Sequence, residues 1–444
     1  MAVTLKKRIR LSLINILCLW LFISSIFFVK PIPCEQSSAP RLKISSLSPH
    51  KAKIIRSFYG QRKEAREGLL ITFPFLLDIT ASQWSKVCPV VVQASKVQGT
   101  HSNFTIHLDE TSLPSELFSI ARSDGGDLRF CLNIDGTNEL ARDIIRYNSS
   151  GLALISVLLP SLTTVDKTIY CFYGNASATD YAHTDTYGAH NAYDSDHLLY
   201  VPIYEAGNGT SNEYQDRTSN HYHGTGGGSN SAKCPDQDTL LMNAGNRFVN
   251  TSNDYIYFGL INLYPTQNQP RTMEIWARPE TESAHQMACY NGSSSGTSYR
   301  SFIIFRPSSG YNKTIECALA TGYLYASNTN AYSQNNTYHV AYTWDGSTSG
   351  SNVPIYINGA LDVTRSHTTN ISGSGEYLNV GNMGSPTYYN NLLGKAAHFK
   401  MHKTNRSADW IKTEYNNISS ASTFAVAGTP QSTAAEKSYI GYGA

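Results

Sequence analysis

The chain has 444 residues, of which 41% are hydrophobic and only 15% are charged, whereas an average globular chain has about 25% charged residues. So low a charge content excludes a long solvated helical rod and a disordered polyampholyte, and the 29 tyrosines favour short strands joined by polar turns. The net charge of +2 hides a split, because residues 1–66 carry 13 basic and 2 acidic side chains while the remainder carries 22 and 31. The acidic remainder lacks the cationic surface that nucleic acid binding requires, so we expect no nucleic acid partner.

The first predicted element is an export segment. Four basic residues precede an uncharged apolar run from Leu11 to Val29, which is the order found in a secretory signal. The run also approaches the ~20 residues that span a bilayer, so residues 1–34 are either a signal peptide or a signal anchor. We therefore expect an extracellular or cell-surface protein that meets a membrane only through this segment if it is not cleaved. Residues 35–68 have the composition of a basic stem or linker.

A second apolar run, Leu69 to Ile79, has Pro74 near its middle. Proline is excluded from the centre of a sheet but is tolerated in an edge strand. Residues 69–83 are therefore predicted to form an edge strand of the chain's own fold. The alternative is a donor strand that adds to another subunit, which would make the protein a self-assembling structural subunit of an extracellular filament or coat.

Short strand signals separated by turn residues recur from Trp84 onward, which is typical of β-sandwiches. We predict an all-β chain with two β-sandwich domains and one short C-terminal helix, for which Ser407 is the expected N-cap. Asp345-Gly346 and Asn358-Gly359 each follow a strand signal and suit hairpin turns. The predicted boundaries are 84–180 for the first sandwich, 181–233 for a loop-rich connection that begins the second domain, 234–428 for the second domain and 429–444 for a flexible tail.

Six cysteines remain when Cys18 and Cys34, in and beside the export segment, are set aside. An even number suits an oxidised protein, and none of them has the C-x-x-C spacing of a metal site. Among the many possible connectivities we predict disulfides Cys131–Cys171 and Cys289–Cys317, with Cys88 and Cys234 bridging the domains or staying reduced. Eleven N-x-S/T sequons are glycosylation candidates: Asn103, Asn148, Asn175, Asn208, Asn250, Asn291, Asn312, Asn335, Asn370, Asn405 and Asn417.

An ordered set of motifs resembles the family called domain of unknown function 2341, over about residues 84–180. The set comprises Trp84-Ser85-Lys86, Asp127-Leu128-Arg129-Phe130, Asp135-Gly136-Thr137 and Ile169-Tyr170-Cys171-Phe172-Tyr173-Gly174-Asn175. Residues 196–428 resemble the concanavalin A-like, laminin G-like jelly roll, through motifs that include Met273-Glu274-Ile275-Trp276 and His339-Val340-Ala341-Tyr342-Thr343-Trp344. The resemblance implies a secreted or surface protein with a binding or adhesive role.

Catalysis and metal binding would each need a specific set of side chains. Retaining glycoside hydrolysis needs two carboxyl groups about 5 Å apart, and Glu274 has no acidic same-face neighbour on its strand. We therefore expect no enzyme and no catalytic residues, and keep a glycoside hydrolase as a distant alternative. The resemblance to the jelly-roll family implies a structural calcium ion, with Asp216 and Asn220 as candidate ligands, although the loop lacks the family's glycine and His398 stands where an acidic residue is common.

Glycan binding or adhesion is the leading prediction for function. Sugar C–H faces stack on aromatic rings, and tyrosine hydroxyls exchange hydrogen bonds with sugar hydroxyls. Candidate ligand-binding residues lie in two predicted loops: Tyr222, Tyr388, Tyr389 and Asn390. The expected partners are glycans or extracellular and cell-surface proteins.

Overall fold

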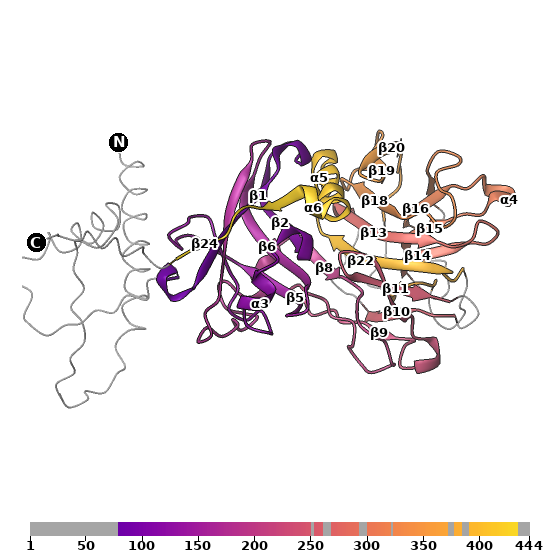
Figure 1. Cartoon of the computed structure of the whole chain (residues 1–444). Helices are drawn as coiled ribbons and strands as arrows, with labels where there is room; N and C mark the ends of the chain where they lie inside the picture. The colour runs from indigo at the N-terminus through magenta and orange to yellow at the C-terminus, as the bar shows by residue number, and fades with distance from the viewer. Residues whose placement is uncertain are drawn as a thin grey trace, which may run out of the picture. The chain divides into compact units, whose positions relative to one another are not determined.

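A computed structural model of the chain describes residues 79–249, 253–260, 268–292, 300–320, 323–371, 377–383 and 390–433, which belong to one compact unit. The predicted export segment, the stem and residues 69–78 lie outside the described residues. Within the described residues, no helix is both long enough and apolar enough to cross a bilayer. The chain is all-β, with several sheets that form two sandwiches and a helix near the C-terminal end (Figure 1).

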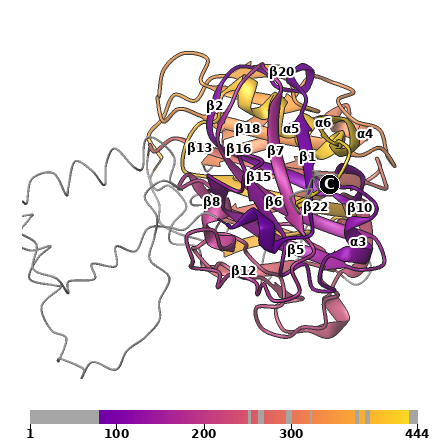
Figure 2. The same ribbon diagram turned by 60° about the vertical axis from the view of Figure 1, so that its left-hand side comes forward.

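The first sandwich packs a six-stranded sheet against a three-stranded sheet (Figure 2). The larger sheet has the order β23(Ala425–Ala427), β1(Lys86–Val92), β7(Lys167–Tyr173), β3(Arg129–Cys131), β4(Glu139–Leu140), and β24(Gln431–Ser432) also pairs with β1. The smaller sheet has the order β2(His101–Asp109), β6(Leu152–Leu162), β5(Arg142–Asn148). Alternate apolar side chains of both sheets meet in one buried cluster, as period-two strands require.

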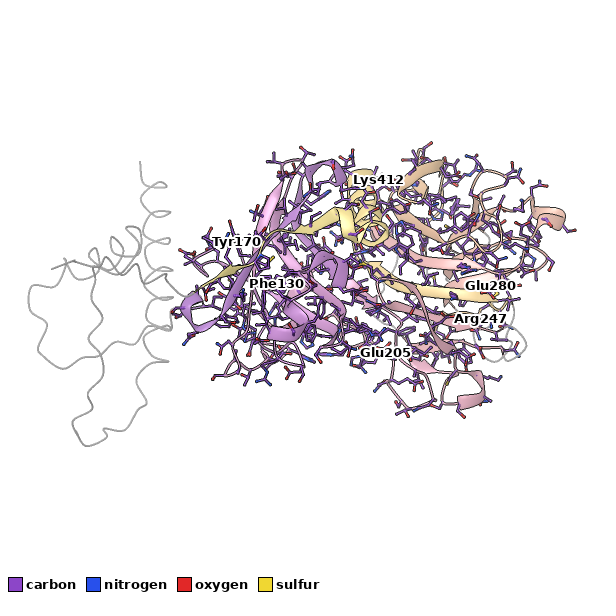
Figure 3. All side chains as sticks on the ribbon, viewed as in Figure 1. Phe130, Tyr170, Glu205, Arg247, Glu280 and Lys412 are labelled. Atoms are coloured by element: carbon purple, nitrogen blue, oxygen red, sulfur yellow. The ribbon has the colours of Figure 1, made fainter. Side chains whose placement is uncertain are left out.

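The second sandwich has eight strands in one sheet and seven in the other. The first of these sheets runs β10(Asp236–Leu241), β11(Ala244–Phe248), β22(Gly394–His402), β13(Arg271–Pro279), β18(Tyr338–Trp344), β19(Val353–Ile357), β20(Ala360–Arg365), with β8(His197–Val201) paired to β22. The other runs β17(Tyr323–Ala326), β16(Ile315–Ala320), β15(Arg300–Phe305), β14(Gln286–Gly292), β21(Tyr377–Val380), β12(Ile256–Leu260), β9(Thr225–Gly226). Apolar side chains fill the space between these two sheets. Arg247 of β11 forms an ion pair of 2.7 Å with Glu280, which follows β13; both residues are labelled in Figure 3.

The chain returns to the first sandwich after it has completed the second. β23 and β24 pair with β1, so the yellow C-terminal strand lies within the indigo and magenta sandwich (Figure 1). The last residues of the predicted second domain, 234–428, therefore belong to the first sandwich, because β23 pairs with β1. Residues 429–433, predicted as part of a flexible tail, instead include a paired strand.

Two helices, α5(Ala408–Ser419) and α6(Ala421–Phe424), lie at the junction of the sandwiches. Ser407 caps α5 as predicted, because its hydroxyl accepts a hydrogen bond from the Trp410 N–H at 3.1 Å. One buried cluster joins Trp410 and Phe424 to the first sandwich's core and to Tyr356 of β19. The helices thus join the core of the first sandwich to the outer face of the second sandwich's eight-stranded sheet.

Both predicted disulfides are contradicted by the strand register. Cys131 lies opposite Tyr170, one residue out of step with Cys171, so the two thiols face opposite sides of the sheet. Cys289 and Cys317 both lie opposite Ile303, which puts two strand spacings, about 9–10 Å, between them. A disulfide needs Cα atoms within about 7 Å, which the spacing of Cys289 and Cys317 exceeds.

Two of the predicted glycosylation sites are also contradicted. Asn291 and Asn417 are fully buried, and a glycan on either would have to displace packed side chains. Asn250 lies outside the described residues. Seven of the other sequon asparagines are exposed and one is half-buried, and these remain predictions: Asn103, Asn148, Asn208, Asn312, Asn335, Asn370 and Asn405, with Asn175 the half-buried one.

Candidate functional site

Two hollows of the first sandwich flank residues 180–187, which we call the 180–187 loop. One hollow, of about 600 Å³, is lined by Trp84, Arg129, Asn175, Asp180 and Tyr181; we call it the Trp84 hollow. The other, of about 620 Å³, includes Glu139, Tyr187, Tyr193 and Asp194 in its lining; we call it the Tyr187 hollow. Both volumes fall in the range of small-molecule sites, about 300–1,000 Å³.

Asp127 organises the floor beside the Trp84 hollow. Its carboxylate accepts the backbone N–H groups of Gly174 and Asn175 at 2.8 and 3.0 Å. Its backbone oxygen accepts the indole N–H of Trp84 at 2.7 Å. Asp127 thereby fixes Trp84 and residues 174–175 around its own position, so the hollow is held by hydrogen bonds formed within the protein.

Arg129 lines the Trp84 hollow and packs between two of its rings. Its guanidinium lies 4.2 Å from the ring centroid of Tyr181 and 5.8 Å from that of Trp84, a cation–π arrangement. It also pairs with Glu139 at 3.5 Å. The charge is therefore neutralised and stacked between rings, and these rings take a fixed orientation.

Tyr181 is the residue of the 180–187 loop that packs on Arg129. Its hydroxyl donates to Glu139 at 2.9 Å, and its ring lies 5.9 Å from that of Tyr187. Burial, and then the Glu139 charge, raise the pKa of Tyr181 to about 12, so the hydroxyl keeps its proton at neutral pH. Asp180 ties the loop to β5 through an ion pair with Arg142 at 2.8 Å.

The arrangement suits recognition of a polyhydroxy ligand. The Trp84 hollow combines aromatic surface with carboxylate, amide and hydroxyl groups, which is the mixture that holds a sugar by its apolar face and its hydroxyls. In the Tyr187 hollow, burial opposes ionisation of Asp194, but His197 and Arg406 hold its pKa well below its usual range. A carboxyl group in that state cannot serve as a general acid at neutral pH.

The predicted ligand-binding residues lie elsewhere. Tyr222 packs against the second sandwich's core, and the Asn390 backbone oxygen accepts the N–H of Met287 at 2.7 Å. Tyr388 and Tyr389 lie outside the described residues. Tyr222 and Asn390 therefore have structural contacts, and their binding role stays a prediction.

Asp216 and Asn220 share one loop, as predicted, but the Asp216 oxygens are already engaged. They accept hydrogen bonds from the backbone of Tyr200, Thr218 and Tyr222 and from the Thr218 hydroxyl, at 2.9 to 3.1 Å. A carboxylate has about four lone-pair positions, so the present conformation leaves none for calcium. Burial raises the pKa of Asp216 to about 6. In the described part of the chain no three His, Cys, Asp or Glu side chains form a metal-holding group, and calcium binding remains a prediction that a calcium-dependent melting temperature would test.

Glu274 is a buried structural residue at the junction of the sandwiches. It accepts hydrogen bonds from the Nε2 atoms of His339 and His402, each at 3.0 Å. Burial by itself raises the pKa, but these two hydrogen bonds hold the pKa of Glu274 well below its usual range. Glu274 is therefore held as a buried, hydrogen-bonded carboxylate, and the expectation of no catalytic residue stays a prediction.

Residues 250–412 match the family model of the concanavalin A-like lectin/glucanases superfamily. The second sandwich is therefore a concanavalin A-like jelly roll, as the sequence resemblance implied. The matched range does not include residues 84–180, so their resemblance to domain of unknown function 2341 stays a prediction. No curated protein matches the chain.

Three solved structures resemble part of the fold. Domain 4 of AbnA, an extracellular arabinanase from Geobacillus stearothermophilus, is 14% identical with a TM-score of 0.34, over 50% of this chain and 98% of its own. The botulinum neurotoxin serotype D ligand binding domain is 12% identical with a TM-score of 0.34, over 50% of each chain. The CBM40 of a Ruminococcus gnavus IT-sialidase is 14% identical with a TM-score of 0.29, over 33% and 83%. Likenesses with TM-scores this low carry no functional conclusion.

Proposed function

We propose that the protein is a non-catalytic glycan-binding or adhesion protein of the cell surface or extracellular space. The observation that carries the proposal is the Trp84 hollow, where rings and hydrogen-bonding groups from separate segments line one recess. The lectin-type superfamily match of the second sandwich supports the same class of ligand. The engaged carboxylates Glu139 and Asp194 favour binding over hydrolysis.

Glycan-array binding by the full chain tests the proposal. The Kd of protein variants for the bound glycan then tests where the site lies. We expect Tyr181→Ala and Tyr187→Ala to raise the Kd at least about tenfold, which corresponds to about 1.4 kcal/mol. Tyr181 contributes a ring to the Trp84 hollow, and the ring of Tyr187 packs 5.9 Å from it. Tyr311→Ala is the matched control, since Tyr311 is an exposed tyrosine of the second sandwich. Thermal melting must first show that each variant is folded.

The outcomes separate three possibilities. Loss of binding in Tyr388→Ala and Tyr389→Ala, with the hollow variants unaffected, would place the site in the second sandwich as the sequence predicted. An array without signal for the folded chain would reject glycan binding. Release of reducing sugar from the bound glycan would show an enzyme instead.

A further inference from the structure

Two cysteines of the first sandwich face each other across neighbouring strands. β1 and β7 lie side by side (Figure 2). They are antiparallel, and their register puts Cys88 directly opposite Cys171. Residues that are directly opposite in an antiparallel pair project from the same face of the sheet. Both side chains accordingly belong to the same buried cluster between the two sheets.

The hydrogen bonding of Pro89 indicates the Cα–Cα distance between Cys88 and Cys171. The Pro89 carbonyl accepts the N–H of Gly428 at 2.7 Å, so Pro89 presents its backbone to β23 and not to β7. Because backbone groups alternate along a strand, Cys88 presents its own to β7 and pairs with Cys171 through hydrogen bonds. The Cα atoms of such a pair are about 5.5 Å apart, within the ~4.4–6.8 Å that a disulfide spans.

The other described cysteines do not compete for these two thiols. Cys131 faces the opposite side of the same sheet, in a cluster with Trp84 and Phe172. Cys289 and Cys317 belong to the core of the second sandwich. Cys234 follows η6(Ser231–Lys233), and its thiol lies 3.6 Å from the Asn230 oxygen of the same segment. In the structure both Cys88 and Cys171 are free thiols. The Cys88 thiol donates to the carbonyl oxygens of Pro89 and Gly428, each at 3.4 Å, so forming the disulfide requires it to turn from these oxygens toward Cys171.

We propose that Cys88 and Cys171 form a disulfide that closes the first sandwich when the chain folds in an oxidising compartment. The two thiols lose two protons and two electrons to an external disulfide such as oxidised glutathione, which becomes two thiols as the new S–S bond forms. Both side chains are fully buried in the folded state. The exchange therefore takes place during folding, before the three-stranded sheet covers the pair.

Peptide mapping without reduction is the test. The full chain is folded in a glutathione redox buffer, free thiols are blocked with N-ethylmaleimide, and the digest is analysed by mass spectrometry. We expect the Cys88 peptide joined to the Cys171 peptide, and a melting temperature that falls by several degrees on reduction. Cys88→Ser should abolish this redox-dependent fall, while Cys289→Ser, the matched buried control, should retain it.

Either of two results would overturn the proposal. One is blocking of both Cys88 and Cys171 by N-ethylmaleimide in the oxidised, folded chain. The other is linkage of either residue to a different cysteine. If Cys88→Ser does not fold, the mapping of the unaltered chain decides alone.

Discussion

Lys400 brings a positive charge into the interior, where the sandwiches meet. Its ammonium group pairs with Glu414 of α5 and lies 3.0 Å from Nε2 of His107 on β2. Both charged side chains are only 2% exposed. A charge buried to this degree is tolerated only with its partner, so the pair makes the position of α5 against β22 highly specific.

We expect Lys400→Met to lower the free energy of unfolding by about 3–5 kcal/mol, because it leaves the Glu414 carboxylate buried without its partner. Urea unfolding measures the loss. Lys395→Met is the matched control on the same strand, since Lys395 pairs with Asp238 at side-chain exposures of 16% and 32%. An exposed pair contributes at most about 1 kcal/mol, so equal losses in the two variants would contradict this account.

His398 makes the stability depend on pH. It lies on β22 between the Tyr200 hydroxyl, 3.0 Å from Nδ1, and the Leu241 oxygen, 3.3 Å from Nε2. Burial, and then the Lys400 charge, lower the pKa of His398 to about 3. The unfolded chain takes up a proton at this histidine below about pH 6.5, whereas the folded chain does so only near pH 3, so stability falls as the pH drops between these values.

We expect His398→Asn to lower the slope of the unfolding free energy against pH by up to ~1.4 kcal/mol per pH unit between about pH 6 and 4. This is the slope that the uptake of one proton on unfolding produces. Asparagine suits the site because the φ of His398 is +47°, in the left-handed region that asparagine tolerates. The measurement is the urea-derived free energy of unfolding at several pH values. An unchanged slope in a folded variant would show that His398 does not titrate as described.

At the scale of elements, the hairpin between β19 and β20 follows directly from its sequence. Asn358 and Gly359 connect the strands with φ values of +52° and +70°, as a two-residue turn of this type requires. A Cβ on Gly359 would also lie 2.6 Å from the Tyr415 Cβ of α5. The turn therefore needs glycine both for its backbone and for its contact with the helix.

Gly359→Ala and Gly350→Ala form a matched pair that separates these two requirements. Gly350 has a φ of +75° but nothing within 4 Å of its Cβ position. We expect Gly350→Ala to lose about 1–2 kcal/mol of stability from the backbone alone, and Gly359→Ala to lose clearly more. Thermal or urea unfolding of both variants tests this, and similar losses would mean that α5 moves aside easily.

Period-two patterns predicted most strands with apolar sequences, and the structure confirms them in β2, β7, β13 and β18. They did not predict β8 or the C-terminal β23 and β24, which are short and whose pairing depends on strands far away in the chain. The disulfide predictions failed for the same physical reason. Which face a cysteine occupies is set by the register between strands, and register is a property of the assembled sheet.

At the scale of the whole molecule, the first sandwich is made of two separated parts of the chain. The second sandwich is inserted between them, since β23 and β24 complete the sheet at β1. The first predicted domain, 84–180, lacks these strands. The free edge of β1 would be exposed in that fragment.

We expect a chain that ends after Phe424 to be less stable and to self-associate, because β1 then presents unpaired backbone groups. Thermal melting and light scattering after size exclusion measure the two effects. A chain that ends after Thr433 is the control, and we expect it to melt like the full chain. Monomeric behaviour of the shorter chain with an unchanged melting temperature would show that β23 and β24 are dispensable.

Sequence motifs could not predict which residues come together at the Trp84 hollow. Trp84, Arg129 and Asn175 stand out in the sequence only as marks of a family resemblance, and nothing in their spacing along the chain shows that they line one hollow. The convergence arises because β1, β3 and β7 are neighbours in one sheet. Tyr181 gives no signal of its own, since it belongs to a polar loop rich in similar residues.

The return of the chain also determines how the molecule would respond to mechanical tension. Thr433 donates its N–H to the Ser85 oxygen at 3.3 Å, and Lys86 lies opposite Ser432, so the two ends of the described fold leave from the same corner. A pull applied at residues 79 and 433 would load the β1–β24 contacts one after another, as in a zipper. The inserted jelly roll would lie outside that line of force until the first sandwich had opened.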